Sequence, residues 1–233
     1  MNKHEPCPNC PSSDAYWVYP DGHGYCFSCK TPTFPTTREN VERKIQAKTL
    51  ATDSSTSPTT VIDPSFWTLK LPPVALAWLS KYGITANEIK ENDIYWNTAD
   101  SGLVFVIDWI SNPDGKAPSV TSTRYFISSQ KYRTRGKKQD SKKIWGLRNE
   151  RLILCEDVLS AIKIGRTSSA KALLGTSPNW SFLQSISPKY DRIDVWLDPD
   201  KRMDSIYISN TLKQFGIKSE PIFSKNDPKT DIT

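Results

Sequence analysis

The sequence lacks several features that would assign it to common classes of protein. No stretch of its 233 residues approaches the roughly 18 consecutive apolar residues that a membrane-spanning helix needs. The segment from Met1 to Pro6 has no apolar core, so we expect no secretory signal. None of its ten glycines belongs to a G-x-x-x-x-G-K-[S/T] motif, which argues against a P-loop. We therefore expect no membrane association and a cytoplasmic location.

The residues that are present favour a folded protein with an acidic partner. Aromatic residues make up 11% of the chain and include eight tryptophans, which is typical of a globular core. The formal net charge is +6, from 31 basic and 25 acidic residues. A positive charge of this size permits binding to nucleic acid but does not require it.

Four of the five cysteines lie within the first 29 residues. They form two C-x-x-C pairs, Cys7 with Cys10 and Cys26 with Cys29. This spacing is typical of a zinc ribbon, in which two sharp turns joined by a hairpin offer four thiolates to one Zn²⁺. Residues 14–25 accordingly read as strand, turn and strand. Two disulfides in a secreted miniprotein are the alternative, which the absence of a signal makes the weaker one.

Aromatic side chains accompany this cysteine block. They are Tyr16, Trp17, Tyr19, Tyr25 and Phe27. Some of them must cover the metal in so small a domain, and the others are free to stack on nucleic-acid bases. His23 is expected to be an exposed contact residue, because four cysteines already complete the zinc site.

The composition changes after the cysteine block. Residues 33–61 are rich in threonine, serine and charges, and Phe34 is their only aromatic residue. Such a composition predicts a flexible linker. We expect a zinc-binding domain over 1–32, a linker over 33–61, an N-terminal α/β and basic subdomain over 62–151, and a second subdomain over 152–233.

The subdomain over 62–151 is predicted to begin with helices and to continue with strands. Residues 64–96 read as helical, with Gly83 ending one helix and Thr85 capping the next. Apolar runs predict strands over 103–110 and 119–127, joined by a turn. Residues 124–151 carry ten basic and two acidic side chains, a net charge of about +8. A solvated loop would explain such a run, but its interleaved aromatic residues favour contact with phosphates.

The last 82 residues alternate between strands and helices, which predicts a mainly parallel sheet covered by helices. Strands are expected over 152–155, 172–174, 193–197 and 218–223, and helices over 158–164, 180–186 and 204–215. Four carboxylates come at or beyond predicted strand ends: Glu156, Asp198, Asp200 and Asp227. The carboxyl ends of parallel strands share one edge, so these residues should converge there. Hard oxygen ligands of this kind bind Mg²⁺ or Mn²⁺.

Three neighbouring residues are expected to have structural roles. Asp157 reads as a helix cap, Asp194 as a surface residue and Cys155 as a buried core thiol.

Together these elements resemble DNA primases, most closely the primase half of podovirus-type bacteriophage primase–helicases. The resemblance is carried by Pro6-Cys7-Pro8-Asn9-Cys10, by Asp21-Gly22-His23-Gly24-Tyr25-Cys26-Phe27-Ser28-Cys29, and by the basic segment around Lys131-Tyr132-Arg133. Further on, Leu154-Cys155-Glu156-Asp157, Leu174-Gly175-Thr176, Leu197-Asp198-Pro199-Asp200 and Lys225-Asn226-Asp227-Pro228 resemble the ordered elements of a Toprim sheet. The resemblance implies an α+β protein with a zinc ribbon linked to a Toprim-containing polymerase domain.

The resemblance also implies an activity, the synthesis of short RNA primers on single-stranded DNA from ribonucleoside triphosphates. The implied template contacts are Asp21, His23, Trp17 and Tyr25. Nucleotide phosphates would be held by Arg124, Lys131, Arg133 and Lys225. Glu156, Asp198 and Asp200 would hold Mg²⁺, with Asp227 in support. The implied partners are a replicative helicase, either separate or truncated from this chain, and a DNA polymerase. The implied location is the host cytoplasm if a phage encodes the chain.

Two departures from the family pattern keep other functions open. Glu156 is followed by Asp157 instead of the usual glycine, and Asp200 is followed by Lys201 and Arg202. A non-catalytic module that binds single-stranded DNA, or a Toprim nuclease that cuts DNA without nucleotides, would carry the same elements. A topoisomerase would need a nucleophilic tyrosine in a further domain.

Overall fold

The computed structural model describes residues 4–18, 24–29, 31–33, 62–112, 115–128, 130–146 and 150–232. The chain divides into two compact units, Met1–Pro58 and Thr59–Thr233. The predicted turn at residues 20–22 and almost all of the predicted linker lie outside the described residues. No described helix has the length and apolar character needed to cross a bilayer.

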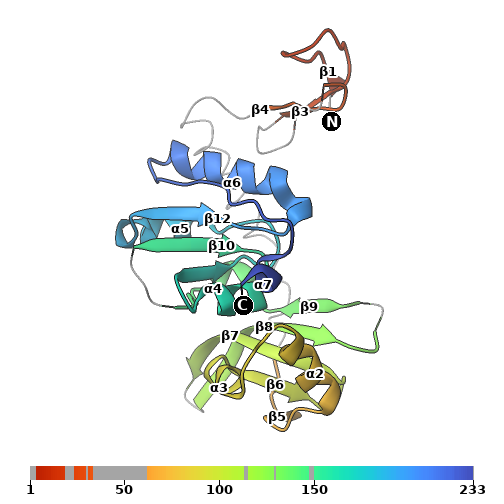
Figure 1. The fold of residues 1–233 in the computed structure, drawn as a ribbon, viewed down its shortest axis with the longest axis vertical. Helices are drawn as coiled ribbons and strands as arrows, with labels where there is room; N and C mark the ends of the chain where they lie inside the picture. The colour runs from red at the N-terminus through yellow and green to blue at the C-terminus, as the bar shows by residue number, and fades with distance from the viewer. Residues whose placement is uncertain are drawn as a thin grey trace. The chain divides into compact units, whose positions relative to one another are not determined.

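The first unit contains a small antiparallel sheet in the order β1-β2-β3-β4 (Figure 1). Its strands are β1 (His4–Glu5), β2 (Tyr16–Val18), β3 (Gly24–Cys26) and β4 (Pro32–Thr33). The pair β2 and β3 is the hairpin that the aromatic and β-branched residues between the cysteine pairs predict. Cys26 is the fully buried apolar residue of this sheet, so its core is formed around the cysteines.

The second unit begins with a five-stranded antiparallel sheet and two helices. The strands follow the order β5 (Trp67–Thr68), β6 (Ile94–Asn97), β7 (Gly102–Asn112), β8 (Gly115–Tyr125) and β9 (Tyr132–Arg135). Helix α2 (Pro73–Lys81) starts with proline, and Gly83 beyond its end adopts a positive φ of 66°. Helix α3 (Ala86–Glu91) has a complete capping box between Thr85 and Glu88.

A three-stranded parallel sheet forms the rest of this unit, in the order β11-β10-β12. Its elements are β10 (Arg151–Cys155), α4 (Val158–Ile164), β11 (Ser169–Ala172), α5 (Trp180–Ile186), β12 (Arg192–Val195), α6 (Arg202–Gln214) and α7 (Pro228–Asp231). Short 3-10 turns lie at Lys138–Asp140, Ser187–Lys189 and Pro199–Lys201. The predicted alternation of parallel strands and helices is confirmed.

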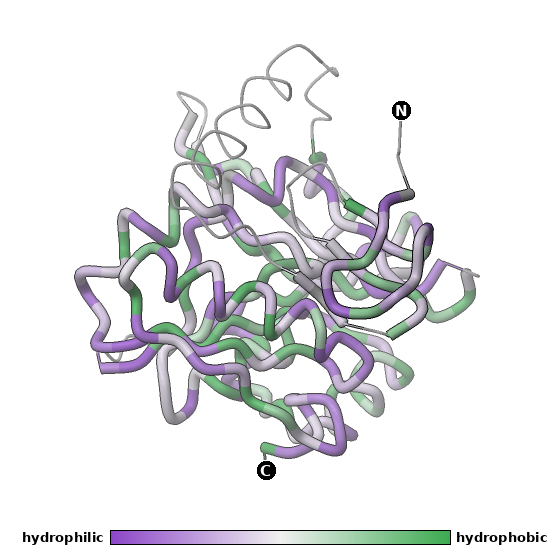
Figure 2. The backbone as a smooth tube through the Cα atoms, turned by 90° about the horizontal axis from the view of Figure 1, so that it is seen from above, coloured by the Kyte–Doolittle hydropathy of each residue, from purple (hydrophilic) through white to green (hydrophobic). Residues whose placement is uncertain are grey.

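The parallel sheet is buried on both faces because side chains alternate along each strand. Along β10, Leu152 and Leu154 pack with α5 and α6, whereas Ile153 and Cys155 pack with α4 and with the antiparallel sheet. Figure 1 shows α6 and α4 on opposite sides of this sheet. In Figure 2 hydrophobic green stretches run through the middle of the trace, and the turns at its left edge are largely purple. A single apolar cluster therefore joins the two sheets of the second unit.

Several local expectations are wrong. Residues 64–96 are not helical throughout, since β5 and β6 flank the two helices and pair with each other. Strand β9 lies inside the basic run, where no strand is expected, because the edge of β8 supplies the hydrogen-bond partners. Residues 218–223 form only an isolated bridge, Val195 to Pro221, although backbone hydrogen bonds align them with β12. The strand predicted over 172–174 instead occupies Ser169–Ala172.

Asp194 is not on the surface. Its side chain is fully buried in β12 and accepts hydrogen bonds from Arg151 Nε at 2.7 Å and from Arg192 Nη2 at 2.8 Å. Burial of a charge without partners would be costly, and the two guanidinium groups remove that cost.

Candidate functional site

The four cysteines of the first unit meet at one point. Their sulfur atoms all lie within 4.8 Å of one another. The Sγ atoms of Cys7 and Cys29 are 3.7 Å apart, as are those of Cys10 and Cys26. Each C-x-x-C turn directs both of its sulfurs inward, and the β2–β3 hairpin brings the two turns together.

This geometry fits a zinc ion. Four sulfurs placed tetrahedrally around Zn²⁺ at about 2.3 Å have edges of about 3.8 Å. The two separations of 3.7 Å match those edges, and no two of the four sulfurs are more than 4.8 Å apart. Hydrogen bonding by Thr31 lowers the pKa of Cys29 to about 6, whereas desolvation raises the pKa of Cys7 to about 12, so Cys29 is the thiol of this pair that more readily forms the thiolate that zinc binds. The predicted ligand set is therefore assembled.

Two of the predicted template contacts are also brought together. Trp17 on β2 and Tyr25 on β3 are directly opposite each other in the register of the hairpin, so their side chains share one face. The Tyr25 ring meets the Phe27 ring edge-on at 5.1 Å, and Phe27 is 59% exposed. Asp21 and His23 lie outside the described residues.

The predicted carboxylates gather at the carboxyl end of the parallel sheet. Glu156 directly follows β10, and Asp198 comes three residues after the neighbouring strand β12. Asp200 lies in the 3-10 turn that precedes α6, and Asp227 occupies the N-cap position of α7. The strands thus deliver these residues to one edge, which we call the carboxylate rim: Glu156, Asp157, Asp198, Asp200 and Asp227.

Two carboxylates of this rim are short of positive partners. Burial raises the pKa of Asp198 to about 6. Burial, and then the nearby charge of Asp198, also raise the pKa of Glu156. Among the described residues, Glu156 Oε2 and Asp198 Oδ1 are buried oxygens without a hydrogen-bond partner. Such atoms fit a hard divalent cation.

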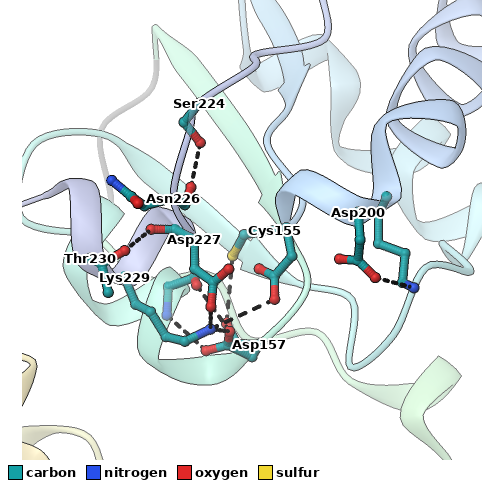
Figure 3. A network of polar contacts seen from close by, with 11 residues as sticks. Cys155, Asp157, Asp200, Ser224, Asn226, Asp227, Lys229 and Thr230 are labelled. Atoms are coloured by element: carbon teal, nitrogen blue, oxygen red, sulfur yellow. Dashed lines mark hydrogen bonds and ion pairs between the residues drawn. The ribbon is translucent and has the colours of Figure 1, made fainter.

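The other carboxylates of the rim already have partners. Asp200 pairs with Lys201 at 2.7 Å, and this hydrogen bond lowers the pKa of Asp200. Asp157 caps α4 as predicted, accepting from the Ser160 backbone N–H at 3.0 Å. Figure 3 shows the Asp200 carboxylate directed at its lysine partner, apart from the cluster around Lys229.

Lys229 is the residue of this site that the sequence analysis did not identify. Its Nζ lies 2.9 Å from Asp227, 3.0 Å from Asp157 and 3.7 Å from Asp198 (Figure 3). Although burial opposes its charge, Asp157 and Asp227 hold the pKa of Lys229 above its ordinary value. Its place after Asp227-Pro228, a helix-start pattern, is the only signal in the sequence that points to it.

The carboxylates do not form a closed cage. Within the described part of the chain, the cysteine cluster is the only group of three or more such ligands whose atoms all lie within 4.8 Å. The predicted magnesium ligands therefore share an edge of the sheet without converging on one point.

Among the predicted phosphate ligands, Arg124 is surrounded by aromatic rings. Its guanidinium carbon lies 5.2 to 5.7 Å from the ring centres of Tyr132, Phe126 and Trp78. It also donates to the Lys131 carbonyl at 3.3 Å, while its Nε is buried without a hydrogen-bond partner. The β8–β9 register pairs Arg124 with Tyr132 and Thr123 with Arg133, so Arg124 and Arg133 point to opposite faces.

Other members of the basic run are divided between structural and exposed positions. Arg135 pairs with Asp100, and Arg151 with Asp194. Lys131 and Arg133 are exposed, as is Lys225, which lies outside this run. Lys138 approaches the rim, because its Nζ lies 3.4 Å from the space that a Cβ on Gly175 would occupy. Gly175 has a φ of 128°, and its N–H donates to the Glu156 carbonyl at 3.3 Å.

The fold matches solved primase structures. The primase fragment of the bacteriophage T7 primase-helicase protein superposes with a TM-score of 0.51 at 17% identity, covering 98% of this chain and 93% of that one. The zinc-binding and RNA polymerase domains of the Aquifex aeolicus primase give a TM-score of 0.52 at 16% identity, covering 98% and 74%. No family model and no curated protein matches the sequence. The chain therefore has the fold of a primase with a zinc-binding and an RNA polymerase part.

Proposed function

We propose that the chain is a DNA primase, which joins ribonucleotides into short primers on a single-stranded DNA template. The observation that carries this proposal is the pair Glu156 and Asp198. These residues follow adjacent parallel strands, have raised pKa values and keep one buried oxygen each without a partner. Among the described residues Glu156 forms no ion pair and Asp198 forms one, at 3.7 Å, which leaves both carboxylates able to bind a cation.

In this proposal the residues of the rim and of the basic run have distinct roles. Glu156, Asp198 and Asp200 hold Mg²⁺ or Mn²⁺, which stabilises the charge that develops during phosphoryl transfer. Asp227 supports them through Lys229. Lys131, Arg133, Lys225 and Arg124 bind nucleotide phosphates, and Lys138 is a further candidate because it lies beside Gly175 at the rim. The primer 3′-hydroxyl attacks the α-phosphate, and pyrophosphate leaves.

The zinc ribbon supplies template recognition in the same proposal. Trp17 and Tyr25, which share one face of the hairpin, stack on bases in this proposal, and Asp21 and His23 contribute further contacts. Residues 1–32 act as the zinc-binding domain, 33–61 as a linker, 62–151 as the basic subdomain and 152–233 as the Toprim subdomain. We place the protein in the cytoplasm, with a helicase and a DNA polymerase as its partners.

Primer synthesis by the purified, zinc-loaded chain tests the proposal. Single-stranded templates that together contain every trinucleotide are supplied with ribonucleoside triphosphates and Mg²⁺, and labelled products are separated by length. We expect short oligoribonucleotides from the wild type. Glu156→Gln should lower their yield by at least 100-fold, because removing one carboxylate charge weakens electrostatic stabilisation of the transition state.

Glu150→Gln is the matched control. Glu150 is exposed immediately before β10, whereas Glu156 is at the other end of that strand. The primer yield of Glu150→Gln should therefore equal that of the wild type. A wild type that binds DNA without making primers would indicate a non-catalytic DNA-binding module instead of a primase. Cleavage of the template without nucleotides, lost in Glu156→Gln, would identify a nuclease instead.

A further inference from the structure

Lys229 provides a positive charge inside the carboxylate rim. Its ammonium group carries three protons and meets three carboxylates, those of Asp227, Asp157 and Asp198. The side chain is only 11% exposed, so water has little access to the ammonium group. The other lysine of the rim, Lys201, is 36% exposed and contacts only Asp200 among the rim carboxylates.

The position of Lys229 is fixed by the surrounding structure. Proline at position 228 starts α7 directly after Asp227, which places Lys229 in the first turn. A second buried lysine, Lys163 on α4, donates from Nζ to the Lys229 backbone carbonyl at 2.8 Å. The lysine is therefore held by its backbone as well as by its charge, unlike a side chain that pairs by chance on a surface.

The contacts of Lys229 divide the rim into two parts. Asp157 uses one oxygen for the Ser160 N–H and the other for the Ser160 hydroxyl and Lys229. Asp227 contributes an oxygen to the ammonium at 2.9 Å. Glu156 belongs to the other part, and Asp198 lies between the two: its Oδ2 is 3.7 Å from Lys229, whereas its Oδ1, like Glu156 Oε2, is buried without a hydrogen-bond partner.

We propose that Lys229 is a positioning residue that takes the place of one metal ion in the rim. It neutralises Asp157 and Asp227, so the rim binds a single divalent cation, at Glu156 and Asp198 with Asp200 beside them. This inference rests on the proposed metal-dependent function of the same rim. It goes further in giving the number of ions and in naming the residue that sets that number.

Manganese binding to the zinc-loaded protein tests this inference. Bound Mn²⁺ is counted from the loss of the free-ion electron paramagnetic resonance signal. We expect about one ion for each wild-type chain and about two for Lys229→Gln, because the released carboxylates form a second site of hard oxygen ligands. Lys229→Arg keeps the charge and should bind about one ion, so the contrast with Lys229→Gln assigns the second ion to the loss of the positive charge. Lys213→Gln, at a lysine that pairs with Glu220 and with no rim carboxylate, should match the wild type.

Thermal unfolding provides a second measurement that does not depend on counting. Without metal, Lys229→Gln should unfold at a lower temperature than the wild type, because carboxylates left together repel one another. Added Mn²⁺ should raise its midpoint by more than it raises that of the wild type, since the ion replaces the lost ammonium. A Lys229→Gln chain that folds only with Mn²⁺ supports the inference, and one that Mn²⁺ does not restore overturns it.

Equal ion counts in the wild type and Lys229→Gln overturn the inference, as does a wild type that binds two ions or none. Primer synthesis by the wild type separates this failure from failure of the proposed function. Primers together with equal ion counts leave the function standing and remove the role of Lys229. A second ion in Lys229→Gln, together with a wild type that makes no primers, supports the role of Lys229 and contradicts the proposed function.

Discussion

Asp194 and Asp198 belong to one short segment of chain but have opposite environments. Asp194 lies within β12, is fully buried, and accepts from two arginines and from the Glu220 backbone N–H at 2.8 Å. Asp198 follows the carboxyl end of that strand, with a lysine 3.7 Å away and one buried oxygen without a partner. Burial raises the pKa of Asp198 to about 6.

This difference distinguishes carboxylates that stabilise the fold from carboxylates that are available to bind a ligand. The first kind has all its partners in the chain, and the second lacks one that must come from outside. The cysteine cluster extends the comparison, because its four sulfurs surround a point at which the chain itself provides no cation. The carboxylate rim lies between these two cases, because Lys229 neutralises some of its carboxylates and leaves others without a partner.

Zinc removal should have the largest effect, because the first unit is built around its metal ligands. Structural zinc contributes about 10 kcal/mol or more to the folding of such small domains. Chelation, or Cys26→Ser, should collapse the dispersed amide NMR signals of residues 4–33. The signals of residues 62–232 should stay dispersed in the same sample. Dispersed signals from residues 4–33 in zinc-free protein would contradict the assignment of a structural zinc site.

Replacement of Asp194 should have the next largest effect. Asp194→Ala leaves two arginines and the Glu220 N–H without their shared acceptor, so we expect a loss of about 3 kcal/mol in the free energy of unfolding. Urea denaturation measures this loss. Asp191→Ala, at an exposed neighbouring aspartate, is the control and should change the free energy by less than about 0.5 kcal/mol. Equal effects of the two substitutions would remove the distinction drawn for Asp194.

Asp198 should show a smaller effect of opposite sign. In metal-free protein at neutral pH, Asp198→Asn should raise the free energy of unfolding by about 1 kcal/mol, a value reduced because solvent reaches part of the group. The raised pKa means that the folded protein holds a proton that the unfolded chain releases. The wild type should therefore lose stability relative to Asp198→Asn as the pH rises from about 4 to about 6.

Thermal midpoints measured across this pH range, with and without Mg²⁺, test the expectation for Asp198. Mg²⁺ should raise the midpoint of the wild type at neutral pH and leave that of Asp198→Asn nearly unchanged. Asp200→Asn is the comparison, because pairing with Lys201 lowers the pKa of Asp200. Removal of the Asp200 charge should therefore not raise the free energy of unfolding. A stabilising effect of Asp200→Asn equal to that of Asp198→Asn would show that the two carboxylates are equivalent.

Much of the fold follows from local patterns in the sequence. Helices α4 and α5 begin and end at the predicted residues, and Thr85 caps α3 as expected. The short strands β5 and β9 were missed because their pairing depends on neighbours far along the chain. Asp194 was misplaced for a related reason: a single aspartate in a strand does not reveal the arginines that will bury it.

The sequence by itself determined the ligands of the zinc site, since C-x-x-C spacing forces two sulfurs toward one point whatever surrounds them. It also determined that carboxylates would collect where parallel strands end. Only the tertiary structure decided how those carboxylates are balanced. Lys229 reaches three of them because α7 packs on α4 through Lys163, a contact between residues 66 positions apart. Charge pairing of this kind depends on distance in space, which local sequence patterns do not contain.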